Sequence, residues 1–215
     1  MKDMLRPYRP HLIASSAIIL LPMLAGAILW NRLPEQMPIH FNLAGEADNT
    51  ASRAFAVFAL PLFMLAVQWL CILLSANDPK RLNISPKMMR LVLWICPVIG
   101  LLASALTYVS ALGARIDLRT IMPLFFGLLF VIIGNYLPKC RQNYTMGIKL
   151  PWTLHDEENW NRTHRFAGYV WTVGGVLIAA GSLAGLQVAL FFVCIALFVA
   201  LPMIYSYVLF LKKNR

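Results

Sequence analysis

The sequence predicts an all-α polytopic membrane protein with about six transmembrane helices. Hydrophobic residues make up 60% of its 215 residues and charged residues only 13%, whereas about 25% of the residues in a soluble domain are charged. Apolar runs of the roughly 20 residues that cross a bilayer recur along the chain. We predict spans at residues 12–30, 54–75, 91–113, 119–136, 167–185 and 188–210.

The interiors of these spans contain no Asp, Glu, Lys or Arg. Ionisable side chains inside a membrane usually mark proton relays and ion pathways. Their absence argues against a pump or a proton-coupled transporter. The lack of a sizeable aqueous domain argues against a conventional soluble enzyme.

The basic residues predict that both termini are cytoplasmic. Of the 19 Lys and Arg residues, all but Arg32, Arg53, Arg115 and Arg119 fall in the N-terminal segment, loop 76–90, loop 137–166 or the C-terminal tail. Lys and Arg are enriched in cytoplasmic loops. The net charge of +10 then faces the anionic lipids of the inner leaflet. Direct nucleic-acid binding is the weaker interpretation, because these charges are spread over four short segments.

We divide the chain into three parts. Residues 1–75 form a two-span unit with a structured outer loop at 31–53, residues 76–136 supply two central spans, and residues 137–215 hold a polar cytoplasmic loop and two C-terminal spans. Ala25-Gly26-Ala27 imitates a signal-peptidase site. We expect the first span to stay uncleaved, because the apolar run continues through Trp30.

The outer loop has the features of a compact folded segment. Pro34 and Pro38 stiffen its start. Residues 39–43 alternate apolar and polar, which predicts a short extended piece. Gly45 then permits a tight turn, and Ser52 or Thr50 can cap the second span.

The polar stretch from residue 135 to 165 interrupts the apolar second half of the chain. Thr153 and Asp156 have the spacing of a capping box, and the acids at 156–158 would then occupy a first helical turn. We expect an interfacial helix that runs into the fifth span, with Trp152 and Trp160 as anchors at head-group depth. Its buried stripe, at spacings of three and four, is Trp160, Thr163, His164, Ala167, Gly168 and Trp171.

The sequence carries no recognisable catalytic or metal-binding motif. It lacks His-x-x-x-His, His-Glu-x-x-His, Cys-x-x-Cys and a phosphate-binding glycine loop, so we predict neither an enzyme nor a cofactor. His40, Glu46 and Asp48 can bind a divalent ion only if the outer loop folds back, and an ordinary hydrogen-bonded role for His40 is the favoured interpretation. The four cysteines are expected to be free thiols.

Small residues in the fifth span predict close helix packing. Gly181 and Gly185 are four residues apart and follow Gly174-Gly175. This spacing lets helix backbones approach closely. We favour an internal packing face over a dimer face.

Two polar segments carry a resemblance to a known family. The outer motif comprises Leu33-Pro34, Pro38-Ile39-His40-Phe41-Asn42 and Gly45-Glu46-Ala47-Asp48. The inner motif comprises Asn135-Tyr136-Leu137-Pro138-Lys139, Asn143, Gly147-Ile148-Lys149-Leu150-Pro151-Trp152-Thr153-Leu154 and Trp160-Asn161-Arg162-Thr163-His164-Arg165. Over about residues 30–172 the chain resembles the SdpI-type immunity proteins, and the outer motif resembles their N-terminal domain. In that family Arg and Thr are usual where this chain has Lys149 and Leu150, and lysine lacks the bidentate anion contact of arginine.

The resemblance implies an integral plasma-membrane immunity or sensor protein. The family's best-known member protects a bacterial cell from a secreted sporulation-delaying toxin peptide and, on sensing the toxin, holds a small repressor at the membrane. The implied partners are the lipid bilayer, an extracellular toxin peptide and a cytoplasmic repressor protein. A small membrane transporter or channel stays open as the alternative, with Asn135 or Gln68 as the residues on which flux would depend.

The resemblance also implies two groups of binding residues. Those of the outer loop are Pro38, His40, Asn42, Gly45, Glu46 and Asp48. Those of the cytoplasmic loop are Asn135, Pro138, Asn143, Gly147, Lys149, Pro151, Trp152, Trp160, His164 and Arg165.

Overall fold

A computed structural model describes residues 5–214, and within them six helices are long and apolar enough to cross a membrane. These six segments are Arg6–Ile28, Phe55–Ala76, Pro86–Ala111, Leu118–Lys139, Glu157–Leu183 and Val188–Lys213. Each predicted span falls on one of them, so the six-span prediction is confirmed. The chain is a multi-pass membrane protein.

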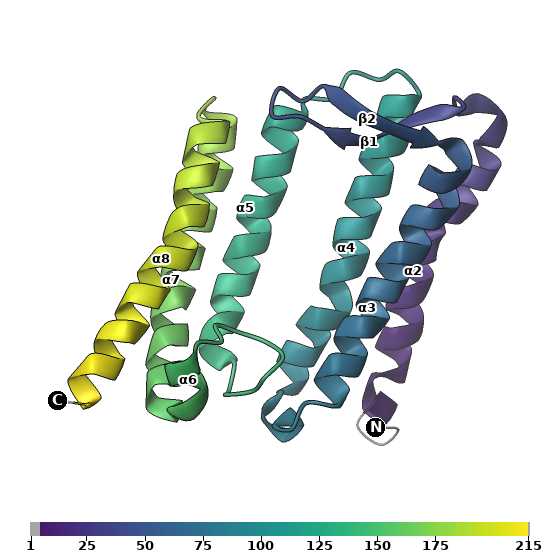
Figure 1. Cartoon of the computed structure of the whole chain (residues 1–215). Coiled ribbons are helices and arrows are strands. Elements are labelled where there is room, and N and C mark those ends of the chain that lie inside the picture. Colours follow the sequence, from purple (N-terminus) through teal and green to yellow (C-terminus); the bar gives the residue numbers. More distant parts are fainter. Residues whose placement is uncertain (1–4, 215) are drawn as a thin grey trace. The chain divides into compact units, whose positions relative to one another are not determined.

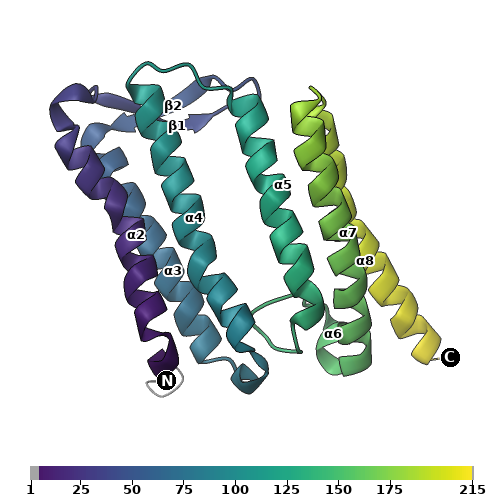
Figure 2. The same cartoon turned by 180° about the vertical axis from the view of Figure 1, so that it is seen from behind.

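The helices and strands are labelled in Figures 1 and 2. The helices are α2 (Arg9–Ile28), α3 (Leu60–Ala76), α4 (Pro86–Ala111), α5 (Leu118–Tyr136), α6 (Pro151–His155), α7 (Glu157–Leu183) and α8 (Gln187–Lys213). The strands are β1 (Gln36–Phe41) and β2 (Ala47–Ser52). Short 3₁₀ turns occur at Arg6–Tyr8, Trp30–Arg32, Arg81–Asn83 and Leu137–Lys139, and a π-helical turn at Phe55–Ala59 leads into α3.

The chain divides into two compact units. The first unit is Met1–Asn77 with Met89–Asp117, and the second is Asp78–Met88 with Leu118–Arg215. The first unit therefore contains α2, α3, the strands and most of α4. The second contains α5 to α8 and the loop that precedes α4. Our division at residues 75 and 136 stays a prediction.

In the first unit the apolar ends of the helices form a core beneath the hairpin. Met37 of β1 and Val57 are fully buried there with Leu33, Ala56 and Tyr108. The Tyr108 hydroxyl donates a hydrogen bond of 2.8 Å to the carbonyl of Pro22, which ties α4 to α2. Deeper in the unit, the Gln68 amide donates to Ser15 Oγ at 2.8 Å, so a polar pair joins α3 to α2.

The outer loop is a β-hairpin. β1 and β2 pair antiparallel with an irregularity between Pro38 and Phe41, and Gly45 turns the chain with φ +78°. This confirms the extended piece and the turn. The second strand was not expected, because residues 47–52 show no alternation of apolar and polar side chains. Ser52, rather than Thr50, lies near the next helix, where its Oγ accepts from the Phe55 N–H at 3.3 Å.

In the second unit α5, α7 and α8 pack through small residues. A Cβ on Gly175 would lie 2.6 Å from the Gly127 carbonyl of α5, and one on Gly174 would lie 2.2 Å from the Phe198 ring of α8. A Cβ on Gly181 would similarly meet Leu190. Internal packing is thereby confirmed for these three glycines. Gly185 instead lies just after α7 with φ +82°, where no atom crowds it.

Candidate functional site

The segment from Leu137 to His155, here called the inner loop, is fastened to the start of the second unit by Asp78. This carboxylate is 3% exposed. Its Oδ2 accepts from the Tyr144 N–H at 2.8 Å and from the Thr145 hydroxyl, while Oδ1 accepts from the Lys80 N–H at 2.7 Å. A buried carboxylate is tolerated when donors surround it in this way. Asp78 was not predicted as a functional residue, because its partners lie 66 and 67 positions further along the chain.

Gln142 and Asn143 continue this network inside the loop. Gln142 Nε2 donates to the Thr153 carbonyl at 2.8 Å, and its Oε1 accepts from the Lys80 amine. Asn143 Oδ1 accepts from two backbone N–H groups, those of Thr145 and Met146. Asn143 was predicted to bind a ligand, but it is 1% exposed. Its side chain therefore shapes the loop from within.

Gly147, His164 and Trp160 hold the other side of the inner loop against α7. The Ile148 N–H donates to His164 Nε2 at 2.9 Å, and His164 Nδ1 lies 2.8 Å from the Trp160 carbonyl. Because Nε2 accepts, Nδ1 carries the proton. The imidazole stacks on the Trp160 indole with centroids 4.1 Å apart, and Trp160 Nε1 donates to the Cys140 carbonyl at 2.7 Å.

Gly147 is required at this contact for two reasons. Its φ is +101°, a left-handed conformation that favours glycine. A Cβ at this position would also lie 2.4 Å from His164 Nε2 and 3.0 Å from the Trp160 ring. The sequence marked all three residues as a binding site, whereas the structure brings them together as a packed joint between loop and helix.

The predicted start of the interfacial helix was wrong. Pro151 begins the short helix α6, and Thr153 lies within it, fully buried, with its Oγ accepting from the Leu150 N–H at 2.9 Å. Asp156 then caps α7 by accepting from the N–H groups of Glu158 at 3.0 Å and Asn159 at 3.3 Å. Proline is favoured at the first helical position, which explains why a separate helix begins at Pro151, six positions before α7 begins at Glu157.

The predicted stripe on α7 is buried from Trp160 to Gly168, and Trp171 is half-buried. Trp160 is therefore not a head-group anchor, since none of it is exposed. Trp152 is half-buried, and its Nε1 donates to Ser206 Oγ of α8 at 2.5 Å. Asn159 binds the same residue through its amide, with Nδ2 2.9 Å from the Ser206 carbonyl. These polar contacts join α6, α7 and α8.

Six of the predicted inner residues lie at the surface of the second unit. The exposed residues are Asn135, Pro138, Gly147, Lys149, Pro151 and Arg165. Lys149 Nζ is 3.2 Å from the Thr145 carbonyl, so its amine lies beside the loop that Asp78 fixes. The inner loop thus has a buried polar frame and an exposed basic exterior.

Two groups of this region have shifted pKa values. Burial raises the pKa of the Cys140 thiol to about 11, partly offset by a hydrogen bond from Asn143. The hydrogen bond from Lys213 lowers the pKa of the Asp156 carboxyl, and the N–H groups that Asp156 caps act in the same direction. The Lys213 amine lies 2.9 Å from Asp156 Oδ2.

The predicted outer residues lie around the turn of the hairpin. His40 Nδ1 lies 2.6 Å from Asp48 Oδ1, and both side chains are largely exposed. Asn42 Oδ1 accepts from the N–H groups of Ala44 and Glu46 and so closes the turn. Glu46 lies near Asn42 Nδ2 at 3.4 Å. Within residues 5–214, no group of three His, Cys, Asp or Glu side chains is placed to hold a metal ion.

Comparison with known proteins identifies both segments. Residues 139–206 match the SdpI/YfhL protein family, and residues 17–65 match a domain of unknown function, DUF1648. The chain is also 30% identical to "Immunity protein SdpI" of Bacillus subtilis (strain 168) over 171 aligned residues. The aligned region covers 78% of this chain and 79% of that protein. The chain belongs to the SdpI/YfhL family. No solved structure matches it.

The matches to the SdpI/YfhL family and to the second domain can be compared with the elements of the structure. The family match begins at Lys139, near the start of the inner loop, and runs to Ser206, the residue that binds Trp152 and Asn159. The second match covers β1 and β2 with parts of the helices on either side. Each match therefore contains one folded polar segment and the helices that hold it.

Proposed function

We propose that this chain is a membrane immunity protein that protects a bacterial cell from a secreted, membrane-active toxin peptide. The observation that carries the proposal is its similarity to an immunity protein over most of both chains. Two folded polar segments on a membrane protein without charged side chains in its span interiors support a binding role over a pumping role.

The outer hairpin is the segment we assign to the toxin. Arg53 holds its base, with Nη1 2.9 Å from the Leu33 carbonyl and its guanidinium 4.5 Å from the centre of the Trp30 ring. The exposed pair His40 and Asp48 then projects from a fixed backbone. A pre-organised surface binds a peptide at lower entropic cost.

The inner loop is the segment we assign to a cytoplasmic repressor protein. Its frame of Asp78, Gln142 and Asn143 is buried. The accessible contacts are exposed cations, above all Lys149 of the loop and Arg165 of α7. Such a surface favours a partner with a negative patch, because charge complementarity steers association.

Survival under toxin tests the outer assignment. A sensitive bacterium expressing the chain is challenged with the sporulation-delaying peptide while its membrane potential is recorded. We expect His40→Ala with Asp48→Ala to abolish protection at unchanged membrane abundance. Thr50→Ala, an exposed hairpin change away from this pair, is the matched control. Full protection by the double variant would refute the outer site.

Transcription tests the inner assignment. In the native host, toxin exposure should raise expression of the gene that encodes this chain. Lys149→Glu with Arg165→Glu should abolish that response while survival persists, because the outer hairpin is intact. The same response in the double variant and in wild type would refute a repressor contact at these cations.

The transporter alternative has one observation in its favour. Gln68 is fully buried within α3, and its Oε1 has no hydrogen-bond partner in the described chain. An unpaired buried carbonyl group is costly and would be available to a permeating donor. Flux through liposomes that is lost in Gln68→Leu would favour transport, and absence of flux across a panel of ions and peptides would count against it.

A further inference from the structure

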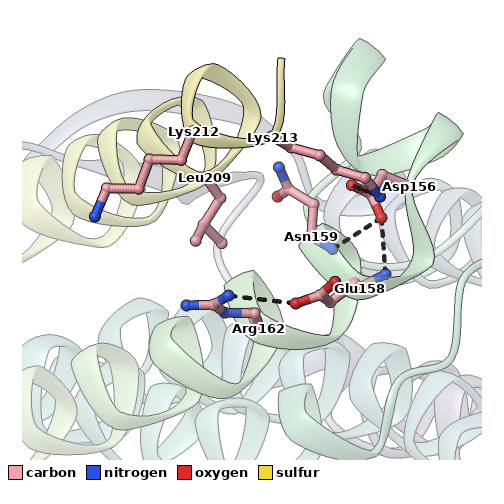
Figure 3. Close-up of a pocket in the computed structure, with 7 residues that line it drawn as sticks. All are labelled: Asp156, Glu158, Asn159, Arg162, Leu209, Lys212 and Lys213. Carbon is pink, nitrogen blue, oxygen red and sulfur yellow. Dashed lines mark hydrogen bonds and ion pairs between the residues drawn. The ribbon is translucent and has the colours of Figure 1, made fainter. Parts of the chain in front are cut away.

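Two pockets lie along the α7–α8 pair. The first lies where α7 begins and α8 ends and has a volume of about 250 Å³. Figure 3 shows its charged walls and one apolar side chain, Leu209. Its lining residues are Asp156, Glu158, Asn159, Arg162, Leu209, Lys212 and Lys213.

The second pocket lies further along the same two helices and has a volume of about 320 Å³. Its floor contains the buried residues Gly174, Cys194 and Phe198, and its rim contains Tyr169 and Val173, which are 69% and 59% exposed. Apart from the Tyr169 hydroxyl and the Cys194 thiol, its side chains are apolar. It lies at a depth where the spans are continuously apolar.

The two pockets lie on one stripe of each helix. On α7, Arg162, Phe166, Tyr169 and Val173 follow one another at steps of four, three and four, which return to the same face of a helix. The Phe166 ring stacks on Tyr205 of α8 with centroids 4.6 Å apart, and this stack lies between the pockets. Gly175 packs on α5, whereas Tyr169 and Val173 of the stripe stay exposed.

The charged pocket has one cation more than its carboxylates neutralise. Lys213 pairs with Asp156 at 2.9 Å and Arg162 pairs with Glu158 at 3.3 Å. Lys212 takes part in neither ion pair and has no hydrogen bond to the described part of the chain. In Figure 3 its amine and the Arg162 guanidinium extend toward the same side of the pocket. An anion placed there would gain both a charge and several N–H donors.

The spacing of the pockets matches an amphipathic molecule. Arg162 and Val173 are eleven residues apart, or about 16 Å along a helix, and one leaflet of hydrocarbon is about 15 Å deep. A soluble anion would leave the apolar pocket unused, and an uncharged lipid would leave Lys212 unused. We propose that this groove binds a phospholipid with an anionic head group, with its phosphate at Lys212 and Arg162 and an acyl chain over Gly174 and Phe198.

Lipid retention tests the proposal on the purified full chain. The protein in detergent is incubated with dioleoyl-phosphatidylglycerol or dioleoyl-phosphatidylcholine, and bound lipid is counted by native mass spectrometry. We expect the amount of bound phosphatidylglycerol to fall about five-fold in Lys212→Gln, because this variant loses one lysine contact to an anionic lipid. Arg141→Gln removes an exposed cation outside the groove and should retain the wild-type adduct. Val173→Trp, which fills the apolar pocket, should lower retention of both lipids.

Three results would overturn the lipid site. Equal retention of the two lipids by wild type would remove the charge argument. Equal loss in Lys212→Gln and Arg141→Gln would show only a general effect of surface charge. Thermal stabilisation by inorganic phosphate that equals that by phosphatidylglycerol would assign the charged pocket to a free anion. Lys212→Gln keeps the test decisive if Val173→Trp fails to fold, because Lys212 is exposed.

Discussion

The backbone N–H of Ile148 donates a hydrogen bond to Nε2 of His164 at 2.9 Å, and this bond ties the inner loop to α7. His164 is 1% exposed, so the donor has no water to replace its partner. The histidine acts here as an acceptor that fixes the loop.

Replacing His164 with phenylalanine should loosen the inner loop. The ring and its stacking on Trp160 are retained, but the Ile148 N–H is left unpaired, which costs about 1–3 kcal/mol. The free energy of unfolding in detergent micelles measures the loss. His155→Phe, at an exposed histidine of the same loop, is the control and should change stability little. Equal stability of the two variants would contradict this role.

Gly147→Ala should destabilise more than the same change at Gly185. Both glycines have positive φ, of +101° and +82°, but only at Gly147 would a Cβ collide with His164 and Trp160. Backbone strain costs about 1–2 kcal/mol at each site, and overpacking adds about 1–3 kcal/mol at Gly147 alone. Thermal midpoints of the two variants, compared in one detergent, give the difference. A loss at Gly185→Ala as large as at Gly147→Ala would refute the steric argument.

Asp78→Asn should weaken the frame of the loop. The carboxylate accepts three hydrogen bonds through two oxygens, and in an amide one of those oxygens becomes an NH2 group that faces a donor and cannot accept. We expect faster protease cleavage at the exposed Tyr144 and a loss of about 1–3 kcal/mol. Glu157→Gln changes an exposed carboxylate in the same unit and serves as the comparison. An unchanged cleavage rate in Asp78→Asn would argue against the frame.

The contact between Asp156 and Lys213 should make stability fall in acid. Lys213 lowers the folded-state pKa of Asp156 below the ordinary value of 3.8. A carboxyl group with a depressed pKa contributes stability that is present above its unfolded pKa and is lost as pH falls through the folded one. Thermal midpoints between pH 7 and pH 3 should therefore drop less steeply in Lys213→Gln than in wild type. Parallel curves would show that the contact makes no contribution.

Cys140 should resist thiol reagents at neutral pH. Its side chain is 3% exposed, and burial raises its pKa to about 11, so the reactive thiolate is scarce. A water-soluble maleimide should label wild type slowly at this site and should label Arg141→Cys, at the exposed neighbour, rapidly. Labelling of Cys140 should accelerate in Gly147→Ala, because loosening the loop exposes the thiol. Rapid labelling in wild type would contradict the burial of this cysteine.

Part of the site was predictable because local signals suffice for it. The stripe from Trp160 to Gly168 follows from helical spacing alone, and Gly45 marks the hairpin turn. The cap of α7 was assigned to Thr153 although Asp156 carries it. Both residues fit a capping pattern. Because Pro151 starts α6 at its first position, Thr153 lies inside that helix and Asp156 is left to cap α7.

The sequence by itself determined the class of the protein, its six spans and its family. Span length and hydrophobicity are properties of contiguous residues, so they can be read without knowing any contact. Only the tertiary structure decided which polar residues bind the chain to itself and which stay free. Asp78 meets Thr145 across 67 positions, and Ser206 meets Asn159 across 47. Such partners satisfy buried polar groups, but no local pattern links residues so far apart. His164 and Trp160 were predicted as ligand contacts because their partners in the loop could not be read from the sequence. In the structure they form the joint that holds the loop on α7.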